Sequence, residues 1–168
     1  YAANVVLERS ALSNSMANIE FVAKRAPSIS NFVHSLQQER GISAGVINTG
    51  GAQQFVSALG TQRGESDRMG ALAQTALEEI VAQNFDAEMN QHIQAISQRL
   101  SELGQVRGRV DGQRIKASEM ASFYGGLIAK LTQIIQDMAL LSTDAHVTAD
   151  ITAYSALIQA KERAGQER

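Results

Sequence analysis

The chain has 168 residues, enough for one domain with a hydrophobic core, and 44% of them are hydrophobic. A single Pro, no Trp and few aromatic residues, set against abundant Ala, Leu, Ile, Gln and Glu, favour helices over strands. The formal net charge of −2 gives no basic face for nucleic acid, and the absence of Cys excludes disulfides and sulfur-ligated metal. We therefore expect an all-α protein that does not bind nucleic acid.

Helical spacing dominates the first part of the chain and predicts one long amphipathic helix. Apolar residues recur there at intervals of three, four or seven, namely Val5, Leu12, Met16, Ile19, Ala23, Ala26, Ile29, Val33 and Leu36. Pro27 interrupts this stripe without changing its phase, so we prefer a kink to two abutting helices. The segment Asn48-Thr49-Gly50-Gly51 then supplies a stop. Such a helix spans ~70 Å at ~1.5 Å per residue, which predicts an elongated antiparallel bundle of the four-helix type.

A second helix is expected over residues 52–83, and its inward seam is polar around Gln62, Arg63 and Ser66. After Asn84, a third helix shows the strict 4-3-4-3 alternation that is typical of bundle packing. The residues that carry this alternation are Met89, Ile93, Ile96, Leu100 and Leu103, followed inward by Arg107 and Val110.

The helical pattern is lost over residues 111–117, and Ser118 is expected to cap a fourth helix that extends to Leu141. The segment Ser142-Thr143-Asp144 offers a further cap. The last helix would then carry an inward stripe of Val147, Ile151, Tyr154 and Ile158. Five antiparallel segments would leave the two chain ends at opposite poles, so we expect either that more chain follows residue 168 or that the third and fourth helices form one rod.

The chain ends resemble those of an excerpt from a longer protein. Residue 1 leads directly into helix-like sequence, and the chain stops inside another such run without a capping signal. No stretch reaches the roughly 20 apolar residues of a membrane span, and no signal peptide is present. We therefore expect a parent protein that was trimmed at both ends and whose membrane anchor, if it has one, lies outside residues 1–168.

Two arginines occupy positions that helical spacing assigns to the core. Extending the first stripe past Leu36 gives Arg40, Ser43 and Ile47, and extending the third stripe gives Arg107. A charged group removed from water costs several kcal/mol unless another group pairs with it, so these guanidinium groups need partners.

Two hypotheses explain the inward arginines. In the first, they form reciprocal ion pairs, such as Glu39 with Arg163 and Glu162 with Arg40. In the second, part of the positive charge stays unpaired until a small anion arrives, and the small residues that follow Arg40 and Arg163 leave room for it. The predominance of Arg over Lys, eleven against four, favours binding of a planar oxyanion.

Several separated motifs resemble the nitrate- and nitrite-sensing (NIT) domain family. They are HSLQQERGISAGVINTGGAQQFVSALGTQR at 34–63 followed by Asp67, the run Arg107-Gly108-Arg109-Val110-Asp111, Tyr124, and ALIQAKERAGQER at 156–168. The resemblance covers roughly residues 28–168. It implies a single helical sensory domain that binds nitrate or nitrite and is attached to a chemoreceptor, a histidine kinase or a transcription-regulating output. It also implies the periplasmic part of an inner-membrane receptor or, alternatively, a cytoplasmic regulatory domain.

The same resemblance implies which residues bind the anion. Arg40 in QERG and Arg163 in KERAG are the primary ligand residues, Arg168 is secondary, and Arg63 and Arg107 are weaker. Two further ligand residues are predicted from their positions in the sequence and not from the resemblance. Ser43 lies on the core face of the first helix, one turn after Arg40. His34 lies about one turn before the Glu39-Arg40 pair, from where its ring could donate to an anion.

Catalytic and metal chemistry have little support in the sequence. His92 and His146 have no companion ligand, so no metal site or cofactor is expected. No Gly-x-Ser-x-Gly turn and no glycine-rich phosphate loop occurs, so we expect no enzyme. Two alternatives to an anion sensor stay open: a structural spacer or dimerisation module, and a helical receptor domain for a small organic ligand. We expect a homodimer, because bundle input modules usually signal across a two-fold interface.

Overall fold

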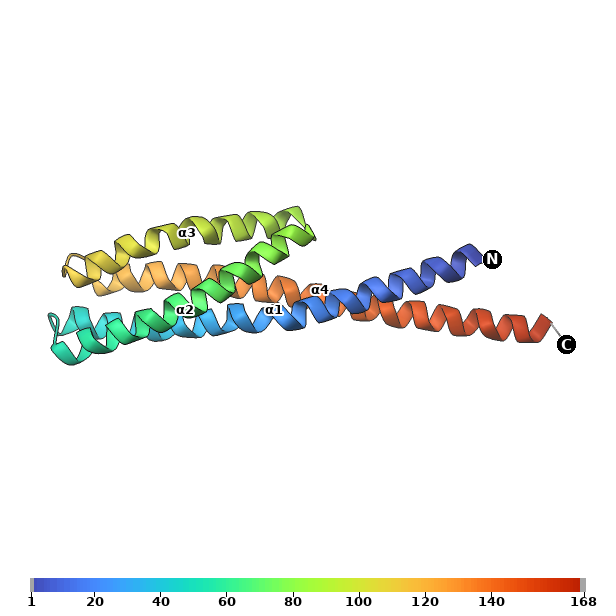
Figure 1. Cartoon of the computed structure of the whole chain (residues 1–168), viewed down its shortest axis with the longest axis horizontal. Coiled ribbons are helices and arrows are strands. Elements are labelled where there is room, and N and C mark those ends of the chain that lie inside the picture. The colour runs from blue at the N-terminus through green and yellow to red at the C-terminus, as the bar shows by residue number, and fades with distance from the viewer. Residues whose placement is uncertain (1, 167–168) are drawn as a thin grey trace. The chain divides into compact units, whose positions relative to one another are not determined.

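Four helices make up the described part of the chain (Figure 1). The structure is a computed structural model that describes the backbone of residues 2–166. Side chains are described for residues 2–144 and for 146, 147, 149–151, 153, 154, 156 and 157. The helices are α1 (Ala2–Asn48), α2 (Gln53–Gln83), α3 (Ala87–Asp111) and α4 (Ala117–Gln166). No strand occurs among these residues, and the all-α helical-bundle prediction is confirmed.

Helix α1 continues through Pro27 without a break, as the unchanged phase of its stripe predicts. The helix ends where two glycines adopt positive φ angles, 67° at Gly50 and 90° at Gly51. The N–H of Gly51 donates to the carbonyl of Val46 (2.8 Å), and the hydroxyl of Thr49 donates to the carbonyl of Gly45 (2.7 Å). These two bonds satisfy the last carbonyls of the helix, which explains the sharp turn into α2.

The break expected at Ser142-Thr143-Asp144 is wrong, because α4 is continuous across this segment. The hydroxyl of Thr143 donates to the carbonyl of Ala139 one turn earlier (3.0 Å), so it supports the existing helix and caps no new one. Ser118 is not the cap of α4 either, because the helix begins one residue earlier, at Ala117. Four helices therefore replace the five expected segments in the part of the chain that the structure describes. The suggestion that the third and fourth helices form one rod is wrong, because α3 ends at Asp111 and the continuous rod joins the expected fourth and fifth segments.

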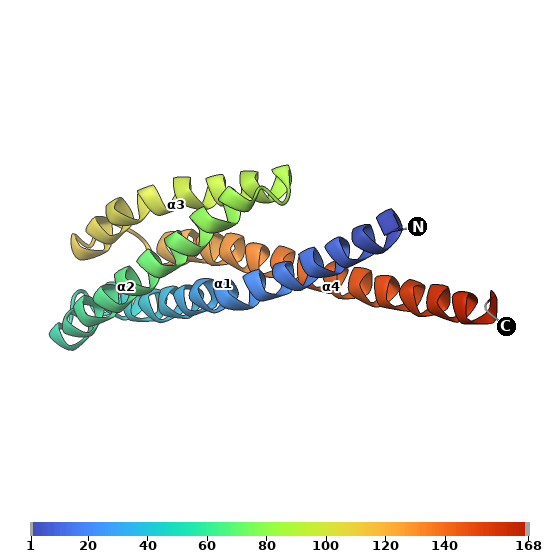
Figure 2. The same ribbon diagram turned by 45° about the vertical axis from the view of Figure 1, so that its right-hand side comes forward.

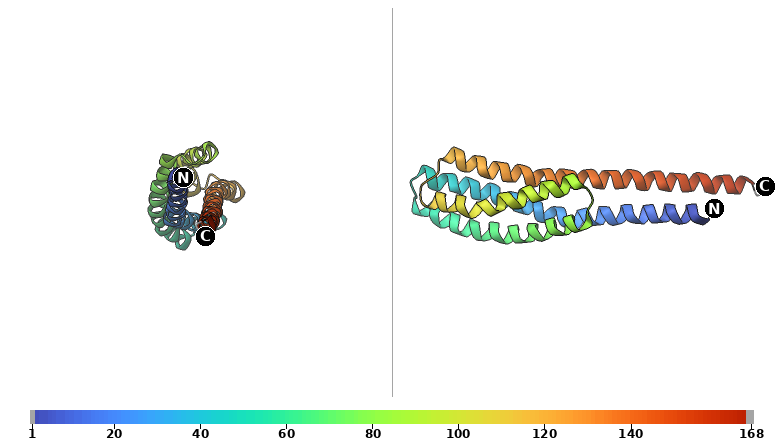
Figure 3. Two further views of the ribbon diagram at one scale, coloured as in Figure 1. Left: turned by 90° about the vertical axis from the view of Figure 1, so that its right-hand side faces the viewer. Right: turned by 90° about the horizontal axis from the view of Figure 1, so that it is seen from above.

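The chain divides into two compact units, which we call unit 1 (residues 1–24 and 137–168) and unit 2 (residues 25–136). Unit 2 contains the second part of α1, all of α2 and α3, and the first part of α4 (Figure 2). These four segments form a four-helix bundle in which the α1–α2 and α3–α4 turns lie at the same end (Figure 3). There, the side-chain amide of Gln113 donates to the carbonyl of Val46 (3.3 Å).

The core of unit 2 follows the predicted periodicity closely. In α3 the 4-3-4-3 residues Met89, Ile93, Ile96 and Leu103 are buried, whereas Leu100 is only half-buried. Fully buried side chains from α1, α2 and α4 complete this core, including Ile29, Leu36, Ile80, Met120, Leu127, Leu131 and Ile134. Each buried side chain of this size contributes roughly 1.5–3 kcal/mol through the hydrophobic effect, so this column stabilises the bundle that positions the polar site.

In unit 1 the predicted inward stripes are partly wrong. Met16 of α1 is 56% exposed, and Val147, Ile151 and Tyr154 of α4 are 52–66% exposed. The described part of unit 1 has only one helical segment from α1 and one from α4, so each helix has a single covered side. Ile158 lies outside the described side chains. No helix in the described part of the chain combines the length and the apolar character that a membrane span requires.

Candidate functional site

A buried carboxylate, that of Glu39, is the centre of a polar cluster inside unit 2. Its side chain has no exposed surface. Arg107 binds it with two nitrogens, Nε to Oε1 at 2.7 Å and Nη2 to Oε2 at 2.9 Å. The hydroxyl of Tyr124 donates to Oε1 (2.7 Å), and Nε of Arg63 lies 3.8 Å from the same oxygen. Each of the four helices therefore contributes one side chain to this cluster.

Two further carboxylates complete the pairing of these arginines. Nη1 of Arg107 donates to Asp67 (2.7 Å) on α2. Nη1 of Arg63 donates to both carboxylate oxygens of Asp111 (2.9 Å each), and its Nη2 donates to the backbone carbonyl of Arg107 (3.3 Å). The positive charges of Arg63 and Arg107 are thus balanced by side chains of the protein.

The pKa shifts follow from this geometry. Burial alone would raise the pKa of Glu39, but the hydrogen bonds from Arg107 and Tyr124 outweigh it and hold that pKa below its usual value. Burial and the neighbouring Glu39 charge raise the pKa of Tyr124. The pKa of Arg107 is also raised, because its bonds to Glu39 and Asp67 outweigh the effect of its burial. Glu39 is therefore a carboxylate at neutral pH, and Tyr124 is a neutral phenol that donates its proton.

Arg40, the residue after Glu39, has a different environment. It is half-buried, and no hydrogen bond or ion pair engages it among the described residues. Its Nη1 atom lies 3.9 Å from the place that a side-chain carbon at Gly125 of α4 would occupy. One turn further along α1, Ser43 is completely buried, and its hydroxyl has no hydrogen-bond partner within the described structure. An unpaired cation and an unpaired buried hydroxyl are therefore neighbours on α1.

The structure corrects the sequence prediction for this part of α1. Spacing from Leu36 placed Arg40 in the core, but Glu39 is the fully buried residue and Arg40 lies at the edge of the buried face. Ser43 is buried as predicted, whereas Ile47 is only half-buried. A step of three residues from Leu36 leads to Glu39 and a step of four leads to Arg40, and both steps are helical. A further step of four from Glu39 leads to Ser43, which is the signal that could have identified Glu39.

The other predicted ligand residues lie in different surroundings. His34 is exposed, and its Nε2 lies 3.3 Å from Nε2 of Gln38. Arg163 belongs to α4, but its side chain lies outside the described part, and so does the whole of Arg168. The ion-pair hypothesis made Arg163 the partner of Glu39 and Glu162 the partner of Arg40. The side chains of Arg163 and Glu162 both lie outside the described part of the chain.

Three residues in or beside the cluster have roles that the sequence did not predict. Asp67 and Asp111 were noted only as parts of motifs, yet they hold Arg107 and Arg63. Tyr124 was assigned to the apolar core and is indeed buried, but its hydroxyl binds Glu39. The polar seam of α2 was predicted correctly, since Ser66 is buried and donates to the carbonyl of Ser35 (3.3 Å).

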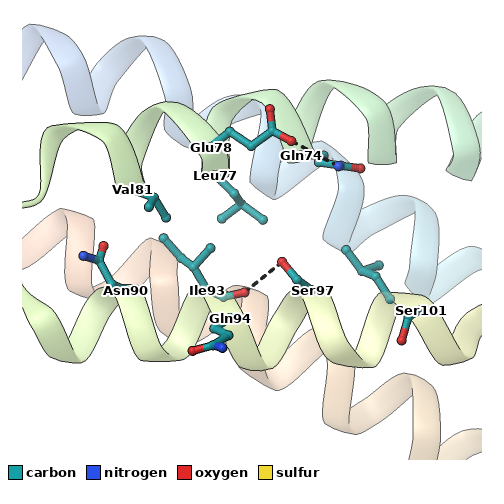
Figure 4. A pocket seen from close by; sticks show the side chains of 10 residues that line it. Gln74, Leu77, Glu78, Val81, Asn90, Ile93, Gln94, Ser97 and Ser101 are labelled. Carbon is teal, nitrogen blue, oxygen red and sulfur yellow. Dashed lines mark hydrogen bonds between the residues drawn. The ribbon is translucent and has the colours of Figure 1, made fainter.

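A groove of about 720 Å³ lies between α2 and α3, away from the arginines (Figure 4). Its floor includes Leu77, Val81 and Ile93, and amide and hydroxyl side chains line its rim. Glu78 is the only charged residue that lines it, and a carboxylate repels an anion. A smaller hollow of about 430 Å³ is lined by Arg63 and Asp111 at the end of unit 2 that carries the α1–α2 turn. Of the two, only this smaller hollow meets the polar cluster.

No arrangement in the described residues brings together three or more His, Asp or Glu side chains that could hold a metal ion. Arg40 and Ser43 are hydrogen-bond donors of the kind that bind anions. Among the described residues, neither side chain forms a hydrogen bond or ion pair with an acidic or basic group. The contacts of Glu39 with Arg107 and Tyr124, and the approach of Arg63, join the four helices.

The chain matches the family model described as nitrate and nitrite sensing over residues 31–168, which is most of its length. No curated protein matches it, and no solved structure does. The matched range includes the Glu39 cluster, Arg40 and Ser43, so the polar centre of unit 2 lies within the family's region. The chain therefore belongs to the nitrate- and nitrite-sensing (NIT) family, whose members are sensory domains and not enzymes.

Proposed function

We propose that this chain is the extracytoplasmic ligand-sensing domain of a bacterial chemoreceptor or histidine kinase and that it binds nitrate or nitrite between helices. Residues 1–168 act as one sensory domain without catalytic activity, and the parent protein is a membrane-anchored homodimer. Membership of the NIT family supports a sensory role for nitrate and nitrite. The proposal adds the place of binding, the cellular location and the oligomeric state.

The observation that carries the binding site is the unpaired state of Arg40 and Ser43. A half-buried guanidinium without a partner is costly, and a buried hydroxyl without a partner is costly too. An oxyanion removes both costs at once, because it accepts a forked pair of bonds from Arg40 and one bond from Ser43. Nitrate offers three acceptor oxygens in one plane, which suits this pair of donors.

Gly125 gives the anion room on the facing helix. A glycine at this place leaves α4 without a side chain opposite Nη1 of Arg40. An anion held by Arg40 and Ser43 on α1 therefore rests against the backbone of α4. Within the proposed site, His34 is a peripheral donor, whereas the side chains of Arg163 and Arg168 lie outside the described part of the chain.

Arg63 and Arg107 have a supporting role in this proposal. Their charges are already balanced by Glu39, Asp67 and Asp111, so they hold α1, α2 and α3 in one register, whereas no described residue pairs with Arg40. An anion that binds α1 and approaches α4 favours one placement of these helices over another. Its differential affinity for the two placements sets the signal, and a displacement of about 1–2 Å is sufficient for such packing.

The pairing of Arg63 and Arg107 also favours a second candidate function, a structural spacer whose buried charges serve only the fold. The two functions differ in their response to anions. We would measure thermal unfolding of the chain with millimolar nitrate, nitrite, chloride, sulfate and a series of small carboxylates at constant ionic strength. A ligand that binds only the folded state stabilises it by RT ln(1 + [L]/Kd), about 2.7 kcal/mol at ~100 times Kd.

The sensor proposal expects selective stabilisation by nitrate or nitrite, which Arg40→Ala abolishes and Ser43→Ala weakens. Arg68→Ala is the matched control, because Arg68 is an exposed arginine of the same unit that pairs with Glu65 one turn away. Equal responses to all anions, or a nitrate response that survives in Arg40→Ala, would support the spacer. Selective stabilisation by a carboxylate would identify a receptor for an organic acid.

A further inference from the structure

The second part of α4 carries an apolar seam that faces away from the rest of unit 1. Leu140, Val147, Ile151 and Tyr154 are 52–66% exposed. Together with the exposed Asp144 they are spaced 4-3-4-3, which is the a/d spacing of a coiled coil. Leu157, also 53% exposed, flanks the end of this seam.

The seam lies opposite the covered side of the helix. Met138 and Ala149, which are 1% and 8% exposed, mark the covered side. At roughly 100° per residue, these two residues share one face of the helix, and Leu140, Val147 and Ile151 lie about half a turn away from it. Helix α4 therefore has two apolar faces in unit 1, and the described residues cover only one of them.

Exposed large apolar side chains are concentrated in unit 1. Of the eleven in the described part of the chain, only Val56, Leu72 and Val81 belong to unit 2. Scattered exposed apolar residues are normal on a soluble protein, but a continuous series at coiled-coil spacing marks an interaction surface. A seam of this kind is complementary to itself, because a second copy presents the same knobs and holes at the same spacing.

The size of the seam also fits a second copy. A large side chain has on the order of 200 Å² of surface, and five that are more than half exposed present roughly 500 Å². Two copies would bury roughly 1,000 Å², near the lower limit of specific interfaces and in the range of weak, transient ones. Asp144 occupies one core position of the seam, where a polar residue fixes register at a cost in stability.

We propose that the exposed seam of α4 from Leu140 to Tyr154 is the surface through which two copies of this chain associate. This interface rests on the proposed homodimer and is distinct from the proposed anion donors Arg40 and Ser43, since none of the seam residues belongs to unit 2. It gives the homodimer a defined contact, helix α4 of one copy against helix α4 of the other.

Sedimentation equilibrium of the full 168-residue chain tests the proposal. The unchanged chain should dimerise at micromolar concentration, and Val147→Asp with Ile151→Asp should be monomeric at concentrations at least tenfold higher. Both side chains are already exposed in the single chain, so the monomer should keep its helical circular dichroism and its melting curve at high dilution. Leu72→Asp is the matched control, because Leu72 is 51% exposed on α2 and lies outside the seam.

Asp144→Leu provides a test in the opposite direction. Removal of two carboxylates from the interface should tighten the dimer by tenfold or more, since a charge at a core position opposes burial. A cysteine placed at Val147, the centre of the seam, should form an intermolecular disulfide on mild oxidation, because the two copies of the central residue meet. The natural chain has no Cys, and Ala129→Cys on an exposed part of α4 in unit 2 serves as the control.

The proposal is overturned if the unchanged chain stays monomeric at ~100 μM, or if Leu72→Asp disrupts association as strongly as the seam variants do. A dimer that Val147→Asp with Ile151→Asp leaves intact would place the interface elsewhere on the chain and would also overturn it. Nitrate binding measured on the monomeric variant separates this outcome from the sensor proposal, which does not require the seam.

Discussion

Arg107 binds both carboxylate oxygens of Glu39 at 2.7 and 2.9 Å, although 68 residues separate the two in the chain. This contact joins α1 to α3 in the interior of unit 2, where the Glu39 side chain is fully buried and that of Arg107 is 16% exposed. Such a pair gives little net stability compared with apolar residues of the same shape, but loss of one partner leaves a buried charge. The fold therefore requires a placement of α1 and α3 in which Glu39 and Arg107 remain paired.

Replacement of Glu39 should destabilise the protein strongly. Glu39→Ala leaves the guanidinium of Arg107 and the hydroxyl of Tyr124 with a buried contact missing, which costs about 3–5 kcal/mol. Urea unfolding followed by circular dichroism measures this loss. Glu65→Ala removes an exposed pair on α2 and should leave the midpoint unchanged. A Glu39→Ala variant as stable as the natural chain would show that the cluster does not form in solution.

Removal of one hydroxyl should have a smaller effect. Tyr124→Phe keeps the buried ring and loses one hydrogen bond to a charged group, which costs about 1.5–3 kcal/mol. The same change should raise the pKa of Glu39, because one of the bonds that lowers it is gone. The acid limb of the unfolding curve should then move to higher pH than in the natural chain. A loss of stability with an unmoved acid limb would mean that the phenol serves packing alone.

The stability of the fold should depend on pH at both ends of the range. The pKa of Glu39 is below its usual 4.5 in the folded state, so its stabilising contribution is complete above that value and is lost as the pH falls through the folded pKa. The pKa of Tyr124 is above its usual 10.0, so its contribution is complete below that value and declines as the pH rises beyond it. Thermal unfolding from acid to alkaline pH should show a plateau between these limits. In Glu39→Gln the loss of stability at acidic pH should be smaller, because residue 39 no longer has a carboxyl group to protonate.

Two glycines in α1 should respond in opposite ways to a methyl group. A side-chain carbon at Gly45 would lie 2.5 Å from Cδ1 of Phe55, so Gly45→Ala forces the ring to move and costs about 1–3 kcal/mol. At Gly41 nothing lies within 4 Å of such a carbon. Gly41→Ala should therefore stabilise the helix by about 0.5–1 kcal/mol, as alanine does at an unhindered position. Urea unfolding of both variants compares them, and stabilisation by Gly45→Ala would contradict the packing of α1 against α2.

Sequence periodicity alone determined most of the helical segments and most of the inward-facing residues of unit 2. It predicted the continuity of α1 through Pro27, the 4-3-4-3 core of α3 and the polar seam around Ser66, and it placed Arg107 and Ser43 on inward faces. These features are local, because they depend on the spacing of apolar residues along one helix and on the turn residues at its ends.

Only the tertiary structure decided which element each face meets. Spacing from Leu36 allows either Glu39 or Arg40 to face inward, and the choice depends on Arg107 and Tyr124, which come from helices far along the chain. Likewise, the spacing of Val147 and Ile151 defines an apolar face but not its partner, so the face expected inside the chain is exposed. A helical period fixes the direction of a side chain about its own axis, whereas its partner depends on the packing of helices that are distant in sequence.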